Sequence, residues 1–403
     1  MFDRLWLILF GAIVAVGIFV SQPALLALPV FMFVLIGAGR WWQRRVLNRV
    51  RYARRFSYTH VFPDEPVDMT IEAHNDKRLP VPWLIAHDSL PENIQAADAV
   101  SPDEPPQATQ STGILHSFVL RGGGRSRVRL RLSPKSRGFY AIGPAILHSG
   151  DPFSLFETMR TEDRRAWLVV YPKIVPLAEL GIPAKDLFGE KRAHQRIFED
   201  PSRTMGVRDY RPGDSMRHIH WKATARHGAP QTRVYEHTVS TSVMICLNVA
   251  TFQHAWQGVD PERLEHAIEL CASIASEGVE RGYAVGAAAN CGAPLTGQSI
   301  HVPPNRAPDQ LRHVLEALAA VTHYIVTPFD SFLLRESPRV RWGATLVVVT
   351  PLLTAAMLGA IAQLRDAGRR VVLVSTDSEP LPPVGNLLAY HLPARRQAEA
   401  THG

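Results

Sequence analysis

The sequence predicts a membrane-anchored protein of several domains: a transmembrane helical hairpin, a β-sandwich-like domain, and an α/β domain with a mainly parallel sheet. Three observations support this fold class. No charged residue occurs from Leu5 to Gly39. Short runs of alternating apolar and polar residues follow Phe56, and β-branched runs alternate with amphipathic segments after residue 240. A chain of 403 residues is long enough for two or three domains.

The uncharged N-terminal segment predicts the hairpin, over residues 1–40. As a single helix, residues 5–39 would extend about 52 Å, whereas a hydrocarbon core is about 30 Å thick. The sequence Ser21-Gln22-Pro23 breaks the run at its midpoint, so we expect two spans, Leu5–Val20 and Ala24–Gly39. A cleaved signal peptide and one long tilted span are the alternatives.

A basic segment follows, over residues 41–55. Seven arginines and no acid occur in the run that it forms with Arg40: Arg40, Arg44, Arg45, Arg49, Arg51, Arg54 and Arg55. Because positive loops stay in the cytoplasm, this run predicts a multi-pass protein of the inner membrane with a cytoplasmic body. The arginines could also bind anionic lipid headgroups. They equal the formal net charge of +7, so the rest of the chain is nearly neutral, which argues against nucleic-acid binding.

The cysteines and glycines argue against a cysteine metal site, a disulfide framework and a phosphate-binding loop. Cys246, Cys271 and Cys291 have neither metal-ligand spacing nor a disulfide pattern, so we expect them to be buried and reduced. The run Gly122–Gly124 lacks the Lys-Ser/Thr pair and the helix of a phosphate-binding loop.

A β-rich domain is expected over residues 56–170. Val67–Ala73, Ser117–Leu120 and Arg127–Leu132 alternate with a period of two, and turn residues separate them. The last run places three arginines on one face, which we expect to be solvated rather than bound to nucleic acid.

The α/β domain is expected over residues 236–403. Its first strand is Val243–Val249, and Asp260 with Pro261 is typical of a helix start. We expect the strands and helices to alternate further: strand Ala284–Ala289, helix Asp309–Val321, strand Thr345–Val349, a helix from Thr350 to about Gly368, and strand Val371–Ser375.

A segment dense in charged and aromatic residues lies between these domains, within residues 171–235. His218 and His220 could point to one side and hold a metal, but no third ligand is placed near them. Asp209 or Asp214 with His220 could serve in acid–base catalysis. The third interpretation, which we favour, is a structural and partner-docking element. In that interpretation Asp214 caps or fixes the turn and pairs with Arg217 or Arg226, and Trp221 is a large apolar anchor.

The same segment resembles the signature of the bacterial family called domain of unknown function 58, R-x-Y-x-P-G-D followed by R-x-I-x-W-K and A-R. The matching residues are Arg208, Tyr210, Pro212, Gly213, Asp214, Arg217, Ile219, Trp221, Lys222, Ala225 and Arg226, with His220 between Ile219 and Trp221. Upstream, Arg137–Pro144 and the run Asp151, Pro152, Phe153, Ser154, Leu155 and Phe156 are similar to two further segments of that family, and Val170-Tyr171-Pro172 is similar to its next strand.

This resemblance implies a von Willebrand factor A-like α/β domain and an association with MoxR-type AAA+ ATPases. Such domains bind Mg²⁺ through D-x-S-x-S after the first strand, whereas this chain has Asn248-Val249-Ala250-Thr251-Phe252. We therefore expect no metal and no cofactor.

The expected function is a non-enzymatic scaffold or adaptor at the inner membrane, docking protein partners such as a MoxR-type ATPase in envelope-related assembly or stress processes. The alternative is a hydrolase or other enzyme using Asp209, Asp214, His218 and His220. We expect Asp214→Ala or Arg226→Ala to affect folding more than chemistry.

Overall fold

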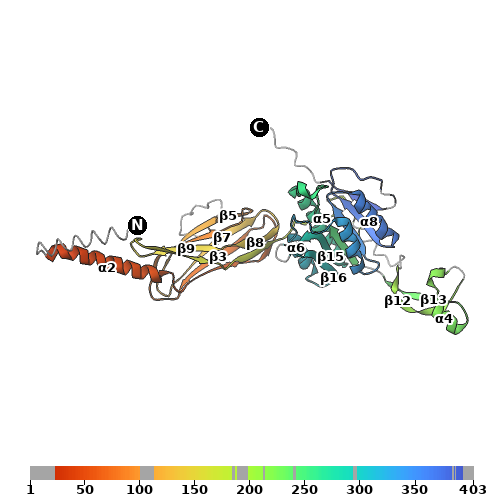
Figure 1. Ribbon diagram of the computed structural model, residues 1–403, viewed down its shortest axis with the longest axis horizontal. Helices are drawn as coiled ribbons and strands as arrows, with labels where there is room; N and C mark the ends of the chain where they lie inside the picture. The colour runs from red at the N-terminus through yellow and green to blue at the C-terminus, as the bar shows by residue number, and fades with distance from the viewer. Residues whose placement is uncertain are drawn as a thin grey trace, which may run out of the picture. The chain divides into compact units, whose positions relative to one another are not determined.

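A computed structural model describes residues 23–99, 113–183, 187, 198–211, 214–238, 242–293, 297–383, 385 and 387–393. The chain divides into two compact units, and the division falls between Val170 and Tyr171. The first unit contains a long helix and a set of short sheets, and the second contains a six-stranded sheet with helices (Figure 1).

The first described element is helix α2 (Pro23–Val46), which has 24 residues. It does not stop at Gly39 but continues through the first arginines, and Val46 is fully buried in the core of the first unit. Lys77 Nζ donates to the Val46 carbonyl oxygen (2.6 Å), which fixes this end of the helix to the strands.

Within the described part of the chain, no helix combines the length and the apolar character needed to cross a membrane. The predicted fold class, which begins with a transmembrane helical hairpin, is therefore wrong. The predicted second span is instead part of α2, which starts at Pro23 and ends inside a folded unit. The predicted first span, Leu5–Val20, lies outside the described residues.

Three sheets make up the rest of the first unit. The first sheet has the order β1-β3-β7-β5, the second β10-β9-β4-β6 and the third β2-β11-β8. The strands are β1 (Val50–Phe56), β2 (His60–Val61), β3 (Val67–Asn75), β4 (Val81–Ser89), β5 (Ile94–Ala99), β6 (Gly113–Leu120), β7 (Arg125–Pro134), β8 (Gly138–Ile142), β9 (Ala145–Gly150), β10 (Glu157–Glu162) and β11 (Ala166–Val170).

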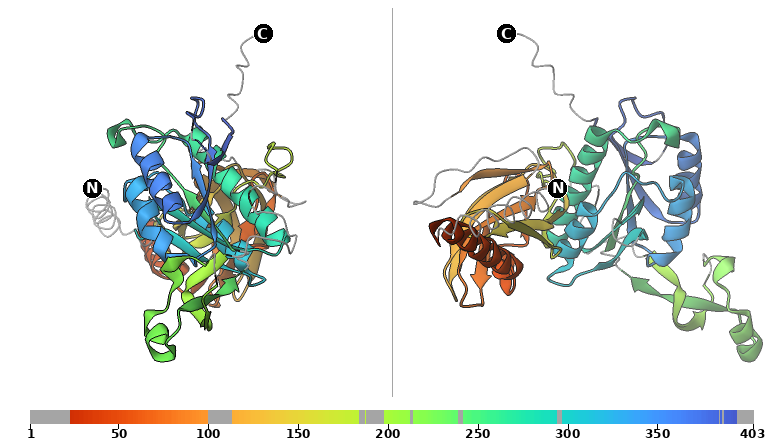
Figure 2. Two further views of the ribbon diagram at one scale, coloured as in Figure 1. Left: turned by 90° about the vertical axis from the view of Figure 1, so that its right-hand side faces the viewer. Right: turned by 60° about the vertical axis from the view of Figure 1, so that its left-hand side comes forward.

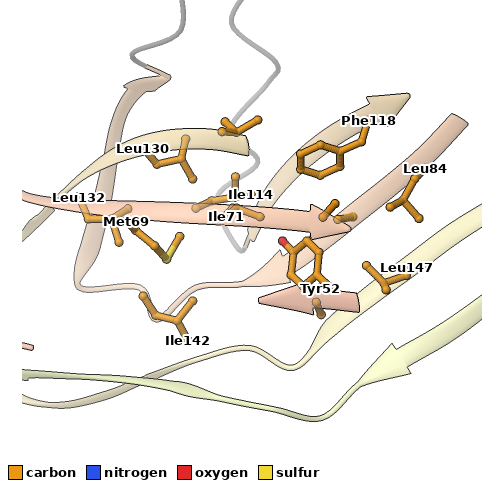
Figure 3. Close-up of a cluster of buried hydrophobic side chains, with 14 of the residues drawn as sticks. Tyr52, Met69, Ile71, Leu84, Ile114, Phe118, Leu130, Leu132, Ile142 and Leu147 are labelled. Atoms are coloured by element: carbon orange, nitrogen blue, oxygen red, sulfur yellow. The ribbon is translucent and has the colours of Figure 1, made fainter. Parts of the chain in front are cut away.

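The first two sheets contribute to one apolar core (Figure 3). Strand β3 alternates strictly, with Met69 and Ile71 fully buried, and Leu147 of β9 is buried in the same cluster. Each such side chain contributes about 1.5–3 kcal/mol when it leaves water. The core also encloses a carboxylate, Asp88, which accepts hydrogen bonds from Tyr52 Oη (2.5 Å) and Arg54 Nε (2.7 Å).

The sheet of the second unit has the order β16-β15-β14-β17-β18-β19. All neighbours are parallel except β16, which pairs antiparallel with β15. Its strands are β14 (Ser242–Leu247), β15 (Ala284–Gly292), β16 (Ser299–Asn305), β17 (Thr345–Thr350), β18 (Arg370–Ser375) and β19 (Leu388–His391).

Helices cover both faces of this sheet (Figure 2). Helices α5 (Pro261–Glu280) and α6 (Gln310–Ala319) lie on one face, and α7 (Phe329–Glu336) and α8 (Ala355–Asp366) on the other. Because both faces are covered, the central strands are buried along their whole length, and β17 has no exposed residue.

Local sequence explains where the helices start. Asp260 caps α5 by accepting hydrogen bonds from the N–H groups of Glu262 and Arg263, and Pro261 is the first helical residue, so the predicted start is confirmed. Helix α8 starts at Ala355 and not at Thr350, because Thr354 is the residue whose side chain caps it. All three cysteines are buried, as the sequence predicts.

Candidate functional site: the signature hairpin

The segment with the family-like signature forms a hairpin. Strands β12 (Phe198–Asp209) and β13 (Gln231–Thr238) pair antiparallel. The connection contains a short 3-10 helix, η1 (Met216–His218), and helix α4 (Trp221–His227). Backbone hydrogen bonds from Tyr210 N to Pro230 O (2.9 Å) and from His220 N to Gln231 O (2.8 Å) close the connection onto β13. Pro212 and Gly213 lie outside the described residues.

An ion pair fixes the turn that follows β12. The guanidinium of Arg208 donates to both oxygens of Asp214, at 2.8 and 2.7 Å, and the backbone N–H of Arg211 donates to the same carboxylate at 2.9 Å. These bonds stabilise the charged form, with the Arg208 contact contributing most, and they lower the pKa of Asp214 from 3.8 to about 2. The predicted pairing of Asp214 with Arg217 or Arg226 is wrong.

The other acid and base candidates also make structural hydrogen bonds. Asp209 accepts a bond from the amide of the buried Gln231 (2.6 Å). His220 caps α4, because its Nδ1 accepts from the N–H of Ala223 (3.1 Å). Three of the four groups proposed for catalysis therefore hold the hairpin together, and no group of three His, Cys, Asp or Glu side chains suited to a metal occurs among the described residues.

The connection buries one apolar residue and exposes others. Ile219 forms a bridge to Thr232 and is only 7% exposed. Trp221 is 69% exposed and Met216 70% exposed. The apolar anchor predicted at Trp221 is thus presented to solvent, on a connection whose backbone is fixed by hydrogen bonds.

Exposed cations surround this tryptophan in the sequence. Arg211, Arg217, Lys222 and Arg226 are all exposed, and none forms an ion pair with a described acid. Together with Trp221 and Met216 they form what we call the hairpin surface.

The predicted site residues of the first unit lie in a tight loop between β9 and β10. Asp151 is fully buried, and its carboxylate accepts hydrogen bonds from the N–H groups of Phe153 (2.9 Å) and Phe156 (2.6 Å). Pro152 and Phe153 are exposed, Phe153 to 67%. The aspartate is therefore the residue that shapes this loop, and the loop belongs to a different unit from the hairpin.

The seven arginines predicted as one basic segment have separate roles. Arg40, Arg44 and Arg45 belong to α2, Arg49 lies in the turn after it, and Arg51, Arg54 and Arg55 belong to β1. The Arg54 side chain is only 3% exposed and is paired with Asp88, so it is a core residue. Arg51 is paired with Asp76 at the surface, at 2.7 Å.

A polar network fills the position after β14 where the family resemblance would place a metal. Asn248 donates from Nδ2 to Thr350 Oγ1 (3.0 Å), and its Oδ1 accepts from Ala250 N (3.1 Å) and Asn290 Nδ2 (3.2 Å). Asn290 Oδ1 in turn accepts from Val249 N (2.9 Å). These oxygens are neutral and already bonded, so the residues present do not fit a hard divalent cation.

A guanidinium binds the loops that follow these strands, and sequence reasoning missed it. Arg263, in the first turn of α5, donates to the carbonyl oxygens of Thr251 (2.9 Å) and Pro351 and to Asp377 Oδ1 (2.9 Å). Asp377 also accepts from the N–H of Leu353 (3.0 Å). One arginine thus connects the loops after β14, β17 and β18, and the nearby carboxylate is neutralised by it. The signal in the sequence was a cation two residues after the helix-starting proline.

Comparison with known proteins identifies the class of the hairpin-bearing region. Residues 206–394 match the family described as "Protein of unknown function DUF58", so the family resemblance predicted from the sequence is confirmed. The chain is also similar to "Uncharacterized protein YeaD" of Bacillus subtilis (strain 168), with 21% identity over 356 residues, which cover 87% of this chain and 82% of that protein.

Two solved structures show weak similarity to this chain. The CARDB domain of PF1109 from Pyrococcus furiosus matches 30% of this chain and 91% of its own, with 10% identity and a TM-score of 0.21. A cohesin module from Clostridium perfringens matches 30% of this chain and 97% of its own, with 10% identity and a TM-score of 0.22.

Proposed function

We propose that the chain is a non-enzymatic adaptor and that the hairpin surface docks a protein partner. The observation that carries the proposal is Trp221, which is 69% exposed on a connection held in place by hydrogen bonds. A tryptophan on a fixed backbone loses little conformational freedom when it is bound, and tryptophan with arginine is the combination most enriched at energetic centres of interfaces.

Two features support docking over catalysis. Asp209, Asp214 and His220 are engaged in bonds that shape the hairpin, so they would have to leave those bonds to serve as acids or bases. The exposed cations Arg211, Arg217, Lys222 and Arg226 would steer a partner with an acidic surface toward the tryptophan.

The partner that we propose is a MoxR-type AAA+ ATPase, in envelope-related assembly or stress processes, as the family resemblance implies. The test is direct binding of the purified full chain to the purified ATPase, with Trp221→Ala compared with Trp256→Ala. Trp256 is a matched control, since it is 83% exposed and lies in the short 3-10 helix η2 (Ala255–Gln257) between β14 and α5.

We expect Trp221→Ala to weaken binding at least about 30-fold, which corresponds to about 2 kcal/mol, and Trp256→Ala to change it less than twofold. Equal effects of the two substitutions would remove the hairpin surface as the docking site. No binding by the unchanged chain would remove this ATPase as the partner.

A further inference from the structure

A second surface, in the first unit, carries charges that its own acids do not balance. The outer face of the β1-β3-β7-β5 sheet presents six arginines, which we call the arginine face: Arg51, Arg55, Arg125, Arg127, Arg129 and Arg131. Residues that are paired in register on neighbouring strands point to the same side of a sheet. The arginines of β1 and β7 therefore share one face with their partners on β3.

Three acids of the same face are each already paired with one arginine. Asp68 pairs with Arg131 at 3.3 Å, Glu72 with Arg127 at 2.7 Å, and Asp76 with Arg51 at 2.7 Å. Arg125 lies close enough to Asp76 to contribute to the lowering of its pKa, although the bond from Arg51 is the main cause.

Besides Arg125, two of the six arginines form no ion pair with these three acids, and the strand register brings them together. Arg55 of β1 and Arg129 of β7 both pair with Thr70 of β3, so they occupy one row with a neutral hydroxyl between them. Neither has an acidic partner among the described residues, and both are exposed. Strands lie about 4.8 Å apart, so the two backbones are about 10 Å apart and both side chains can reach a ligand over Thr70.

We propose that the arginine face docks an acidic segment of a protein partner, with Arg55 and Arg129 each binding one carboxylate across the Thr70 row. Guanidinium groups bind carboxylates in a bidentate manner. Carboxylates two residues apart in an extended segment are about 7 Å apart, a spacing that flexible arginines match.

The acids on the face favour discrete carboxylates over a nucleic acid. Asp68 and Glu72 lie one row to either side of Thr70, about 7 Å away along the strand. A phosphate backbone carries closely spaced charges along its whole length, and those beyond the Thr70 row would meet arginines already paired with Asp68 and Glu72. A short acidic segment that crosses the Thr70 row would avoid them.

The test uses the full chain and a synthetic peptide with alternating glutamate and serine, with binding followed by fluorescence anisotropy. The variant is Arg55→Gln with Arg129→Gln, which leaves the three ion pairs intact. The control is Arg306→Gln with Arg341→Gln, which removes the same charge from two exposed arginines of the second unit.

We expect the arginine-face variant to bind the peptide at least tenfold more weakly, and the control variant to match the unchanged chain within twofold. A glutamine–serine peptide should not bind. Equal losses in both variants would overturn the proposal, as would tighter binding of a single-stranded oligonucleotide than of the acidic peptide. Trp221→Ala should leave peptide binding unchanged, so this proposal and the docking function of the hairpin fail independently.

Discussion

The hairpin and the carboxyl end of the six-stranded sheet each contain a cluster of bonded polar residues, but the two clusters differ in burial. At the sheet edge, Asn248 and Asn290 are 3% and 1% exposed and bond to one another. On the hairpin, the ion pair between Arg208 and Asp214 is partly exposed, with side-chain exposures of 41% and 18%. The first network is shielded from solvent, whereas the second lies at the surface and fixes a connection whose side chains are exposed.

The difference shows how to separate a structural polar cluster from a docking element. Buried polar groups must be bonded to each other, and removing one partner leaves an unsatisfied group. An exposed pair contributes little to stability, so its value lies in what it positions, here the connection that presents Trp221. The two regions should therefore respond very differently to substitution.

Arg263→Ala should have the largest effect. It leaves Asp377 nearly buried without its cation, so we expect the free energy of unfolding of the second unit to fall by about 3 kcal/mol. Urea denaturation followed by hydrogen exchange of β14 and β17 measures this. The free energy of unfolding of Arg263→Lys should lie between those of the unchanged chain and of Arg263→Ala, because lysine keeps the charge but not the planar fork of donors. If Arg263→Ala lowered the free energy of unfolding by less than about 1 kcal/mol, the bonds of Arg263 would not be what holds these loops together.

Asn290→Ala should cost about 2 kcal/mol, because it leaves Val249 N without its buried acceptor and removes one of the two donors to Asn248 Oδ1. The same exchange experiment applies. Asn305→Ala, at the exposed end of β16, is the matched control and should change stability by less than about 0.5 kcal/mol. Similar values for the two asparagines would contradict the contrast between buried and exposed networks.

Gly228→Ala should destabilise the hairpin by about 1 kcal/mol. Gly228 ends α4 with φ of 68°, a left-handed conformation that alanine adopts at a cost. Gly206→Ala, on β12 of the same hairpin with no atom near the added methyl group, is the control. Amide exchange in α4 should rise only in the first variant, and an equal rise in both would mean that the left-handed conformation of Gly228 is not the cause.

Acid should loosen the hairpin turn only at very low pH. The pKa of Asp214 is about 2 in the folded chain and 3.8 ordinarily, so its contribution is present above about pH 4 and is lost as the pH falls toward 2. Carbon-13 NMR of the Asp214 carboxyl group gives the titration midpoint. Arg208→Gln should raise that midpoint toward 3.8, whereas Arg226→Gln should leave it unchanged. An unshifted midpoint in the unchanged chain would rule out the ion pair.

Trp221→Ala and Arg226→Ala should have the smallest effects on stability, each below about 0.5 kcal/mol, because both side chains are exposed. For Arg226 this replaces the expectation from sequence that its loss disturbs folding. Thermal unfolding of the full chain is the measurement. A clear drop for either variant would mean that the hairpin surface is packed against something in the free protein.

Periodicity was enough to predict many of the strands and helices. The runs at Val67–Ala73 and Arg127–Leu132 are within β3 and β7, and the arginines of β7 are exposed as expected. Strand β16 was not predicted, because Ser299–Asn305 contains Pro303 and Pro304, which remove backbone donors. It pairs with β15 through a register shift between Val285 and Ala287.

Three features could not be predicted because they depend on contacts made in three dimensions. The uncharged N-terminal run indicates apolar character, but not that the helix from Pro23 continues past Gly39 and ends in a folded core. The partner of Asp214 depends on how the turn closes. The role of Arg54 depends on Asp88, which is 34 residues away in the sequence.

The guanidinium of Arg263 has a consequence for motion. Because it binds groups on three loops at once, opening any one of them breaks bonds made by the others. The loops after β14, β17 and β18 therefore form one cooperative unit, and local fluctuations should be rare at this edge. The amide of Leu353, bonded to Asp377, should exchange with solvent only when that whole unit opens.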